Sequence, residues 1–211
     1  MSLRALLSLL APPLCAACGA SAGSAEPLCG RCRLELRWLG HEPVAVGGIG
    51  AWAPLAYEAG ARALVRALKF RGAVRIADAM ASQIAANAPP GWLAGATLVP
   101  VPLHPARLRS RGYNQAERLA AALAARTGLV VDDCLERSGP AATQVGRGRG
   151  RRLRGIAGSI AVGAGRSPPA RAVLVDDVLT TGATISTCAA ALSCAGVTEL
   201  RAVAYARTPG R

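Results

Sequence analysis

Apolar and polar positions follow two different spacings between residue 51 and the end of the chain. Short apolar runs predict strands at residues 51–57, 96–101, 129–133, 171–175 and 197–206. Apolar residues three and four positions apart predict helices at residues 60–70, 74–88, 114–126 and 183–195. Strands that alternate with helices of this length are typical of βαβ units. The pattern therefore predicts an α/β fold with a parallel sheet.

The first 40 residues lack this regular pattern and are rich in cysteine. We expect a short helix at residues 5–14 and a linker at residues 41–50, where Pro43 is followed by Gly47, Gly48 and Gly50. The sequence therefore predicts a small N-terminal unit at residues 1–45 and the α/β domain at residues 51–211.

Four of the seven cysteines form two C-x2-C pairs, which are ten residues apart: Cys15, Cys18, Cys29 and Cys32. Two such pairs supply the four thiolates of a tetrahedral zinc site, and a site filled by protein thiolates is structural. The surrounding residues offer little core, so metal would supply the folding free energy. The alternative is two redox-active or incidental pairs. We expect the three remaining cysteines to be small buried hydrophobic residues: Cys134, Cys188 and Cys194.

The charge of the chain points to a polyanionic partner. Twenty-five lysines and arginines against 12 acidic residues give a net charge of +13, and Lys69 is the only lysine. Such a balance favours nucleic acid or a phosphate-rich small molecule. Apolar runs stay shorter than the about 18 residues that a membrane helix needs, and Pro12 and Pro13 interrupt the signal-like stretch at residues 5–14. We therefore expect a cytoplasmic protein without a membrane span.

A strand–turn–helix segment carries the first candidate site in the α/β domain. The apolar run at residues 173–175 leads into Asp176 and Asp177, and the turn that follows holds Thr180, Thr181, Gly182, Ala183 and Thr184. Ligands of open α/β sheets bind at this strand edge, and the N-terminus of a helix suits a phosphate group. The two carboxylates face sugar hydroxyls or Mg²⁺ in this interpretation. The alternative is a capped helix with solvated acids.

A basic segment with the sequence VPVPLHPARLRSRGYNQA, residues 99–116, begins within the strand predicted at residues 96–101 and continues beyond its end. Arg107, Arg109 and Arg111 alternate along it, so they meet at one anion only where the chain folds back. The alternative is a solvated basic loop, with residues 113–115 starting the next helix.

Together, these motifs resemble a known family. Residues 173–184 resemble the phosphoribosyl-pyrophosphate (PRPP) motif of type I phosphoribosyltransferases, and residues 99–116 resemble the V-P-V-P-L…R-G-[FY]-N-Q-A signature of ComF/GntX-type proteins. The cysteine pairs and residues 69–72 fit the same family. The resemblance covers nearly the whole chain. It implies a type I phosphoribosyltransferase-like parallel sheet flanked by helices, preceded by a small zinc ribbon.

The resemblance also implies site residues. The chain would bind PRPP, or a related phosphorylated sugar, with Mg²⁺ through Asp176 and Asp177. Residues 102–111 would form a pyrophosphate loop. The implied phosphate-binding residues are Thr180, Thr181, Gly182, Ala183, Thr184, Arg107 and Arg111.

Residues 143–159 resemble the mobile loop of this family. Gln144, Arg151, Arg152 and Gly158 match, whereas Gly155 stands where the family usually has Asn and Ile160 where it has Phe. By resemblance, Arg151 and Arg152 are catalytic residues of a lid that neutralises the leaving pyrophosphate. The alternative is an unstructured basic loop.

Two functions remain open at this point. The first is the transfer of a phosphoribosyl group to an amine or nucleobase, with the acceptor unidentified and turnover undecided. The second is a non-catalytic role in DNA uptake during competence, in which the chain binds single-stranded DNA or a helicase. Tyr113 is the only aromatic residue near the basic segments, which argues against direct stacking of bases. A homo-oligomer is compatible with both functions.

Overall fold

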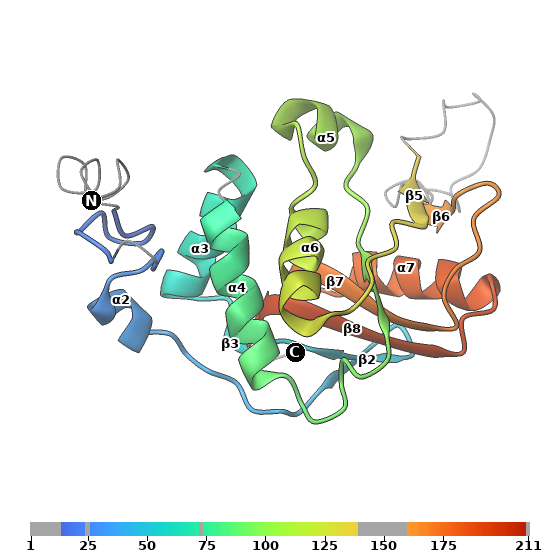
Figure 1. Ribbon diagram of the computed structural model, residues 1–211, viewed down its shortest axis with the longest axis horizontal. Coiled ribbons are helices and arrows are strands. Elements are labelled where there is room, and N and C mark those ends of the chain that lie inside the picture. The colour runs from blue at the N-terminus through green and yellow to red at the C-terminus, as the bar shows by residue number, and fades with distance from the viewer. Residues whose placement is uncertain (1–13, 24–25, 72–73, 139–159, 210–211) are drawn as a thin grey trace, which may run out of the picture.

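A mostly parallel β-sheet forms the centre of the computed structural model, which describes residues 14–23, 26–71, 74–138 and 160–209 (Figure 1). The strand order is β1-β2-β8-β7-β4, with β3 paired to β8. These strands are β1 (Val44–Val46), β2 (Ile49–Trp52), β3 (Leu55–Ala56), β4 (Thr97–Pro100), β7 (Arg171–Leu179) and β8 (Glu199–Arg207). Only β1 and β2 pair in the antiparallel direction within this sheet. The predicted α/β class is confirmed.

Helices accompany the sheet at nearly all of the predicted positions. The helices are α2 (Gly30–Leu34), α3 (Ala59–Arg71), α4 (Val74–Asn87), α5 (Pro105–Arg111), α6 (Gln115–Thr127) and α7 (Ala183–Cys194). A separate two-stranded sheet joins β5 (Leu135–Arg137) to β6 (Ile160–Val162). The predicted helix at residues 5–14 and the predicted lid at residues 143–159 lie outside the described residues, apart from Leu14. Within the described ranges, no helix has the length and hydropathy needed to cross a membrane.

Two hydrophobic clusters lie on opposite faces of the sheet, because successive side chains of a strand point to opposite sides. On β7, Val173 and Val175 pack into the cluster formed with α3, α4 and α6. Ala172 and Leu174 pack into the other cluster, with α7. The cysteine region lies beside α3 (Figure 1), and Cys32 belongs to the first cluster. The N-terminal unit therefore shares its core with the α/β domain.

Three element predictions were wrong. Residues 41–50, expected as a linker, form the hairpin of β1 and β2 around Gly47 and Gly48. The strand expected at residues 51–57 is divided into β2 and β3 at Pro54, whose nitrogen has no proton for a sheet hydrogen bond. The strand expected at residues 129–133 is reduced to one bridge, from Val131 to Leu98.

Residues 102–111, expected as a loop, contain the helix α5. His104 caps its N-terminus by accepting a hydrogen bond from the Ala106 amide, and Pro105 takes the first helical position, where a missing N–H costs nothing. Gly112 ends the helix in a left-handed conformation, with φ of 77°. Because α5 buries none of its residues, it lacks the apolar face by which a helix is recognised from sequence.

Candidate functional site

The four cysteines of the two C-x2-C pairs converge on one point. Their Sγ atoms all lie within 4.8 Å of one another, and none of the four forms a disulfide: Cys15, Cys18, Cys29 and Cys32. Cys18 Sγ is 3.7 Å from Cys29 Sγ. Four thiolates about 2.3 Å from a zinc ion in a tetrahedron would be about 3.8 Å apart. This donor set and spacing fit a structural metal ion such as zinc.

Local backbone geometry brings the two pairs together. The first pair lies in a turn in which the Gly19 amide donates to the Cys15 carbonyl, with Gly19 at φ of 75°. The second pair begins α2, with Cys29 at the N-cap and Cys32 inside the helix. The Ala16 amide donates to the Pro27 carbonyl and joins the two segments.

The metal-free thiols differ in acidity. Burial opposes ionisation of Cys15, but hydrogen bonds from the backbone of Cys29, Cys18 and Ala17 outweigh it and lower the pKa to about 6. The Cys32 pKa rises to about 12, first because its thiol hydrogen-bonds with Cys18 and second because of burial. Metal binding at neutral pH must therefore displace a proton from Cys32, so it favours high pH.

A second candidate site lies near the C-terminal end of β7. Asp176 Oδ1 accepts a hydrogen bond of 2.8 Å from the Asp177 amide. Burial, and then the neighbouring Asp177 charge, raise the pKa of Asp176 well above its usual value. Asp177 is only 3% exposed, and its Oδ2 atom lies 2.8 Å from Lys69 Nζ. The two acids therefore form a desolvated pair whose excess charge is balanced by a lysine from α3.

The turn after β7 leads directly into α7. Thr180 and Thr181 are exposed, Gly182 is the N-cap with φ of 76°, and no acidic residue occupies the first helical turn. Gly182 provides no side-chain cap; the Thr181 hydroxyl accepts a long hydrogen bond of 3.4 Å from the Ala183 amide. This helix end therefore offers backbone N–H groups and an uncompensated positive dipole to an anion.

Two of the predicted phosphate-binding arginines face one pocket beside α5. Arg107 and Arg111 are one helical turn apart, so they share a face, whereas Arg109 does not line the pocket. The pocket has a volume of about 380 Å³, and it is lined by Lys69, Phe70, Ala106, Arg107, Ser110, Arg111 and Tyr113. It contains three cations and no carboxylate.

The Arg-Gly-Tyr-Asn-Gln part of the basic segment, residues 111–115, lies beside this pocket and forms hydrogen bonds to neighbouring elements. The Tyr113 hydroxyl donates to the Leu68 carbonyl at 2.5 Å, which ties α6 to the end of α3. Asn114 caps α6 by accepting from the Ala116 amide, and its amide group donates to the Val101 carbonyl. Asn114 is therefore a buried structural residue, as in the alternative in which residues 113–115 start a helix.

Phe70 lies beside Arg111 of the basic segment in the structure. The two residues are far apart in the sequence, so the sequence did not indicate this contact. Its ring is 75% exposed, and the Arg111 guanidinium lies 5.7 Å from its centre. This corrects the expectation that Tyr113 alone is near the basic segments. The expectation that Cys194 is buried was also wrong, because this thiol is exposed, whereas Cys134 and Cys188 are buried as expected.

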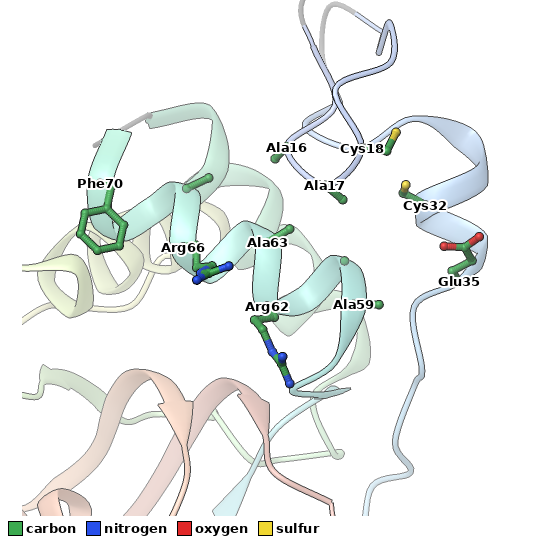
Figure 2. A pocket seen from close by; sticks show the side chains of 12 residues that line it. Ala16, Ala17, Cys18, Cys32, Glu35, Ala59, Arg62, Ala63, Arg66 and Phe70 are labelled. Atoms are coloured by element: carbon green, nitrogen blue, oxygen red, sulfur yellow. The ribbon is translucent and has the colours of Figure 1, made fainter.

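Phe70 also lines a groove with a volume of about 590 Å³ between the cysteine region and α3. Figure 2 shows Cys18, Cys32 and Glu35 on one side of it. Arg62, Ala63, Arg66 and Phe70 lie along α3 on the other side. Alanine and glycine supply most of the remaining lining, and their small size keeps the groove open.

Arg207 is a further candidate that the sequence did not single out. It lies at the end of β8 and lines a cavity of about 80 Å³ with Thr180 and Thr181. Its Nε atom is buried without a hydrogen-bond partner among the described residues. Its position beside the turn depends on the pairing of β8 with β7, opposite Leu179. Arg151 and Arg152, by contrast, lie outside the described residues.

Comparison with known proteins adds one relative. Over 113 residues, the chain is 34% identical to Competence protein F of Haemophilus influenzae, a match that covers 52% of this chain. The matched region spans 49% of the length of Competence protein F. No family model matches the sequence. The similarity to a ComF protein and the four-cysteine cluster together agree with the resemblance that the motifs indicated.

Proposed function

We propose that this protein binds PRPP, or a related ribose 5-phosphate ligand, at the carboxyl edge of β7. The observation that carries the proposal is the position of Asp176 and Asp177 just ahead of the turn into α7, whose N-cap residue Gly182 provides no side-chain cap. In this arrangement the carboxylates accept hydrogen bonds from ribose hydroxyls, and the turn from Thr180 to Thr184 holds the 5-phosphate. Arg207 supplies a nearby cation for the same phosphate. The pocket that contains Arg107 and Arg111 has the charge to hold pyrophosphate.

Phosphoribosyl transfer is the reaction that these groups support best. A nitrogen atom of an amine or nucleobase would form a bond to C1 of the ribose as the bond from C1 to pyrophosphate breaks. Positive charge develops on the sugar and negative charge on the leaving group. In this proposal the Asp176–Asp177 pair stabilises the positive charge on the sugar, and Arg107 and Arg111 stabilise the negative charge on the leaving group. Arg151 and Arg152 belong to the proposal as the lid.

Two metal ions belong to the proposal. Carboxylate oxygens are the ligands that Mg²⁺ takes together with substrate phosphates, so the acid pair fits that ion, which would supply further charge neutralisation of the pyrophosphate. The four thiolates fit zinc. We propose that residues 1–45 form a zinc ribbon on a phosphoribosyltransferase-like domain of residues 51–211.

Calorimetry with PRPP and Mg²⁺ tests the ligand. We expect binding by the unaltered protein, and its loss in a double variant with Asp176→Asn and Asp177→Asn, because each charged hydrogen bond contributes about 1.5–3 kcal/mol. A control with Asp132→Asn and Asp133→Asn removes the same charge from the segment before β5, where both acids pair with Arg166, and should leave binding intact. Equal affinity of the protein and the double variant would contradict the proposal. Incubation with PRPP and a panel of bases, with analysis of products, then decides turnover.

A second candidate function is the handling of single-stranded DNA in competence. It is favoured by the relative's name, Competence protein F, and by the groove beside α3. Arg62 and Arg66 lie one turn apart along this groove, and exposed Phe70 at its end offers a ring for base stacking. The same residue also lines the pocket of Arg107 and Arg111, so Phe70 borders both basic hollows.

Oligonucleotide binding at several salt concentrations separates this function from the first. Phe70→Ala should weaken binding of a single strand by about 1–3 kcal/mol through lost stacking. Arg62→Ala with Arg66→Ala should reduce the slope of log affinity against log salt by about 1.4, or 0.7 for each phosphate contact. Leu34→Ala is a control, because Leu34 is exposed and does not line the groove. Unchanged oligonucleotide affinity in both variants would exclude binding of single-stranded DNA along this groove.

A further inference from the structure

Lys69 faces both parts of the proposed site. Its Nζ atom is 2.8 Å from Asp177 Oδ2, and both side chains are largely withdrawn from water, with exposed fractions of 24% and 5%. The same lysine lines the cationic pocket with Arg107 and Arg111. One ammonium group therefore lies between a buried carboxylate and a pocket suited to an anion.

Contacts of the neighbouring residue fix the backbone at Lys69, so only the lysine side chain can move between Asp177 and the pocket. The preceding residue, Leu68, is fully buried, and its carbonyl accepts the hydrogen bond from the Tyr113 hydroxyl. The lysine side chain has four flexible carbons and a compact charge with three donors. Small rotations of that side chain move the ammonium group without moving α3.

We propose that Lys69 is a positioning residue that couples the two parts of the site, pairing with Asp177 when the pocket is empty and with the bound anion when it is filled. An anion in the pocket then draws the ammonium group from Asp177 and leaves the acid pair more negative. The proposal rests on the proposed function for the ligands of the acid pair, and it adds a coupling between the anion in the pocket and the cation at the acid pair. Because coupling is reciprocal, a cation at the acid pair also favours the anion.

The charges make this exchange specific to Lys69. Asp177 Oδ2 is buried, and Lys69 is its ion-pair partner among the described residues. A buried carboxylate without a partner is costly, so Asp177 gains most from a new cation when Lys69 leaves. Among the described residues, neither Arg107 nor Arg111 forms an ion pair with an acid, so no carboxylate competes with the anion for these two arginines.

A single substitution tests the coupling, because it should change two affinities in opposite directions. In Lys69→Met, the affinity for inorganic pyrophosphate without divalent metal should fall about tenfold, as expected for one lost charged hydrogen bond. The affinity for Mn²⁺ alone should rise, because the competing ammonium group is gone. Arg109→Met removes the same charge from α5 outside the pocket and should change neither affinity. Parallel losses of both affinities, or no change in either, would overturn the proposal.

The single lysine also allows a direct observation on the unaltered protein, in which Asp177→Asn serves only as the reference for the direction of the shift. Protein labelled only at lysine carries one side-chain resonance from the folded chain, that of Lys69. Pyrophosphate should shift this resonance in the same direction as Asp177→Asn does, since both release Lys69 from the carboxylate. A resonance that stays unchanged at saturating pyrophosphate would overturn the proposal, as would the absence of pyrophosphate binding.

These outcomes are distinguishable from failure of the proposed function. If the protein does not bind PRPP, but Lys69→Met changes the affinities for pyrophosphate and Mn²⁺ in opposite directions, the coupling stands and the proposed sugar ligand is wrong. If the protein binds PRPP, but Lys69→Met changes the two affinities in parallel, the ligand stands and the coupling is wrong.

Discussion

Gly182 lies directly against the side chain of Val46, so that a methyl group on Gly182 would overlap Val46 Cγ1. A second close contact lies at the turn of the hairpin, where a Cβ on Gly47 would lie 2.6 Å from Ser186 Cα. The hairpin of β1 and β2 therefore packs against the first turn of α7. Its shape sets the position of the turn that we propose to bind phosphate.

Gly182→Ala should destabilise the protein for two reasons. The left-handed backbone costs an alanine about 1–2 kcal/mol, and the overlap with Val46 costs about 1–3 kcal/mol more. Denaturant unfolding measures the sum. Gly128→Ala is the matched control, since Gly128 has a similar φ of 71° with no atom near its missing Cβ. Equal destabilisation by the two substitutions would contradict the contact with Val46.

Zinc content should depend on the cysteine cluster. Elemental analysis of the purified protein should find one zinc ion per chain, and Cys29→Ser should lose it and melt at a lower temperature. Metal binding at such sites contributes about 10–16 kcal/mol to folding. Cys194→Ser changes an exposed thiol outside the cluster and should keep the metal. An intact fold with negligible zinc would exclude a structural metal.

The acid pair should make stability depend on pH. Because burial raises the pKa of Asp176 above the usual 3.8, the folded state retains a proton that the unfolded state loses. The free energy of unfolding must then fall as pH rises from about 4 toward the folded pKa. Asp176→Asn keeps the Oδ1 acceptor but removes this charge, so it should melt higher than the unaltered protein at neutral pH. The difference should shrink toward pH 4; a difference independent of pH would refute the assignment.

Asn114 should prove structural. Asn114→Ala removes the cap of α6, at about 0.5–2 kcal/mol, and leaves the buried Val101 carbonyl without its donor, at about 1–3 kcal/mol. Asn114→Ser keeps a capping hydroxyl and should lose only the second part. Unfolding curves of the two variants measure the difference, and identical curves would show that the amide contact with Val101 contributes nothing.

Predictions from sequence succeeded where the signal was local. The apolar run of β7, the acids, the turn and the helix α7 are contiguous, and α6 lies within one residue of the helix predicted at residues 114–126. Predictions failed for short elements that depend on distant partners. Strand β1 has three residues, and its partner β2 is held by β8, about 150 positions away in the chain.

Spacing along the chain was enough for the four-cysteine cluster and the strand–turn–helix segment, because knuckle turns and helix ends are formed by near neighbours. Packing between distant segments established the rest. It brought Lys69 of α3 to Asp177 of β7, and it placed the ring of Phe70 beside Arg111. The packing of the helices on the sheet decides which distant side chains come into contact. That arrangement comes from burial of the whole core, and it leaves no periodic trace in the sequence around any one of these residues.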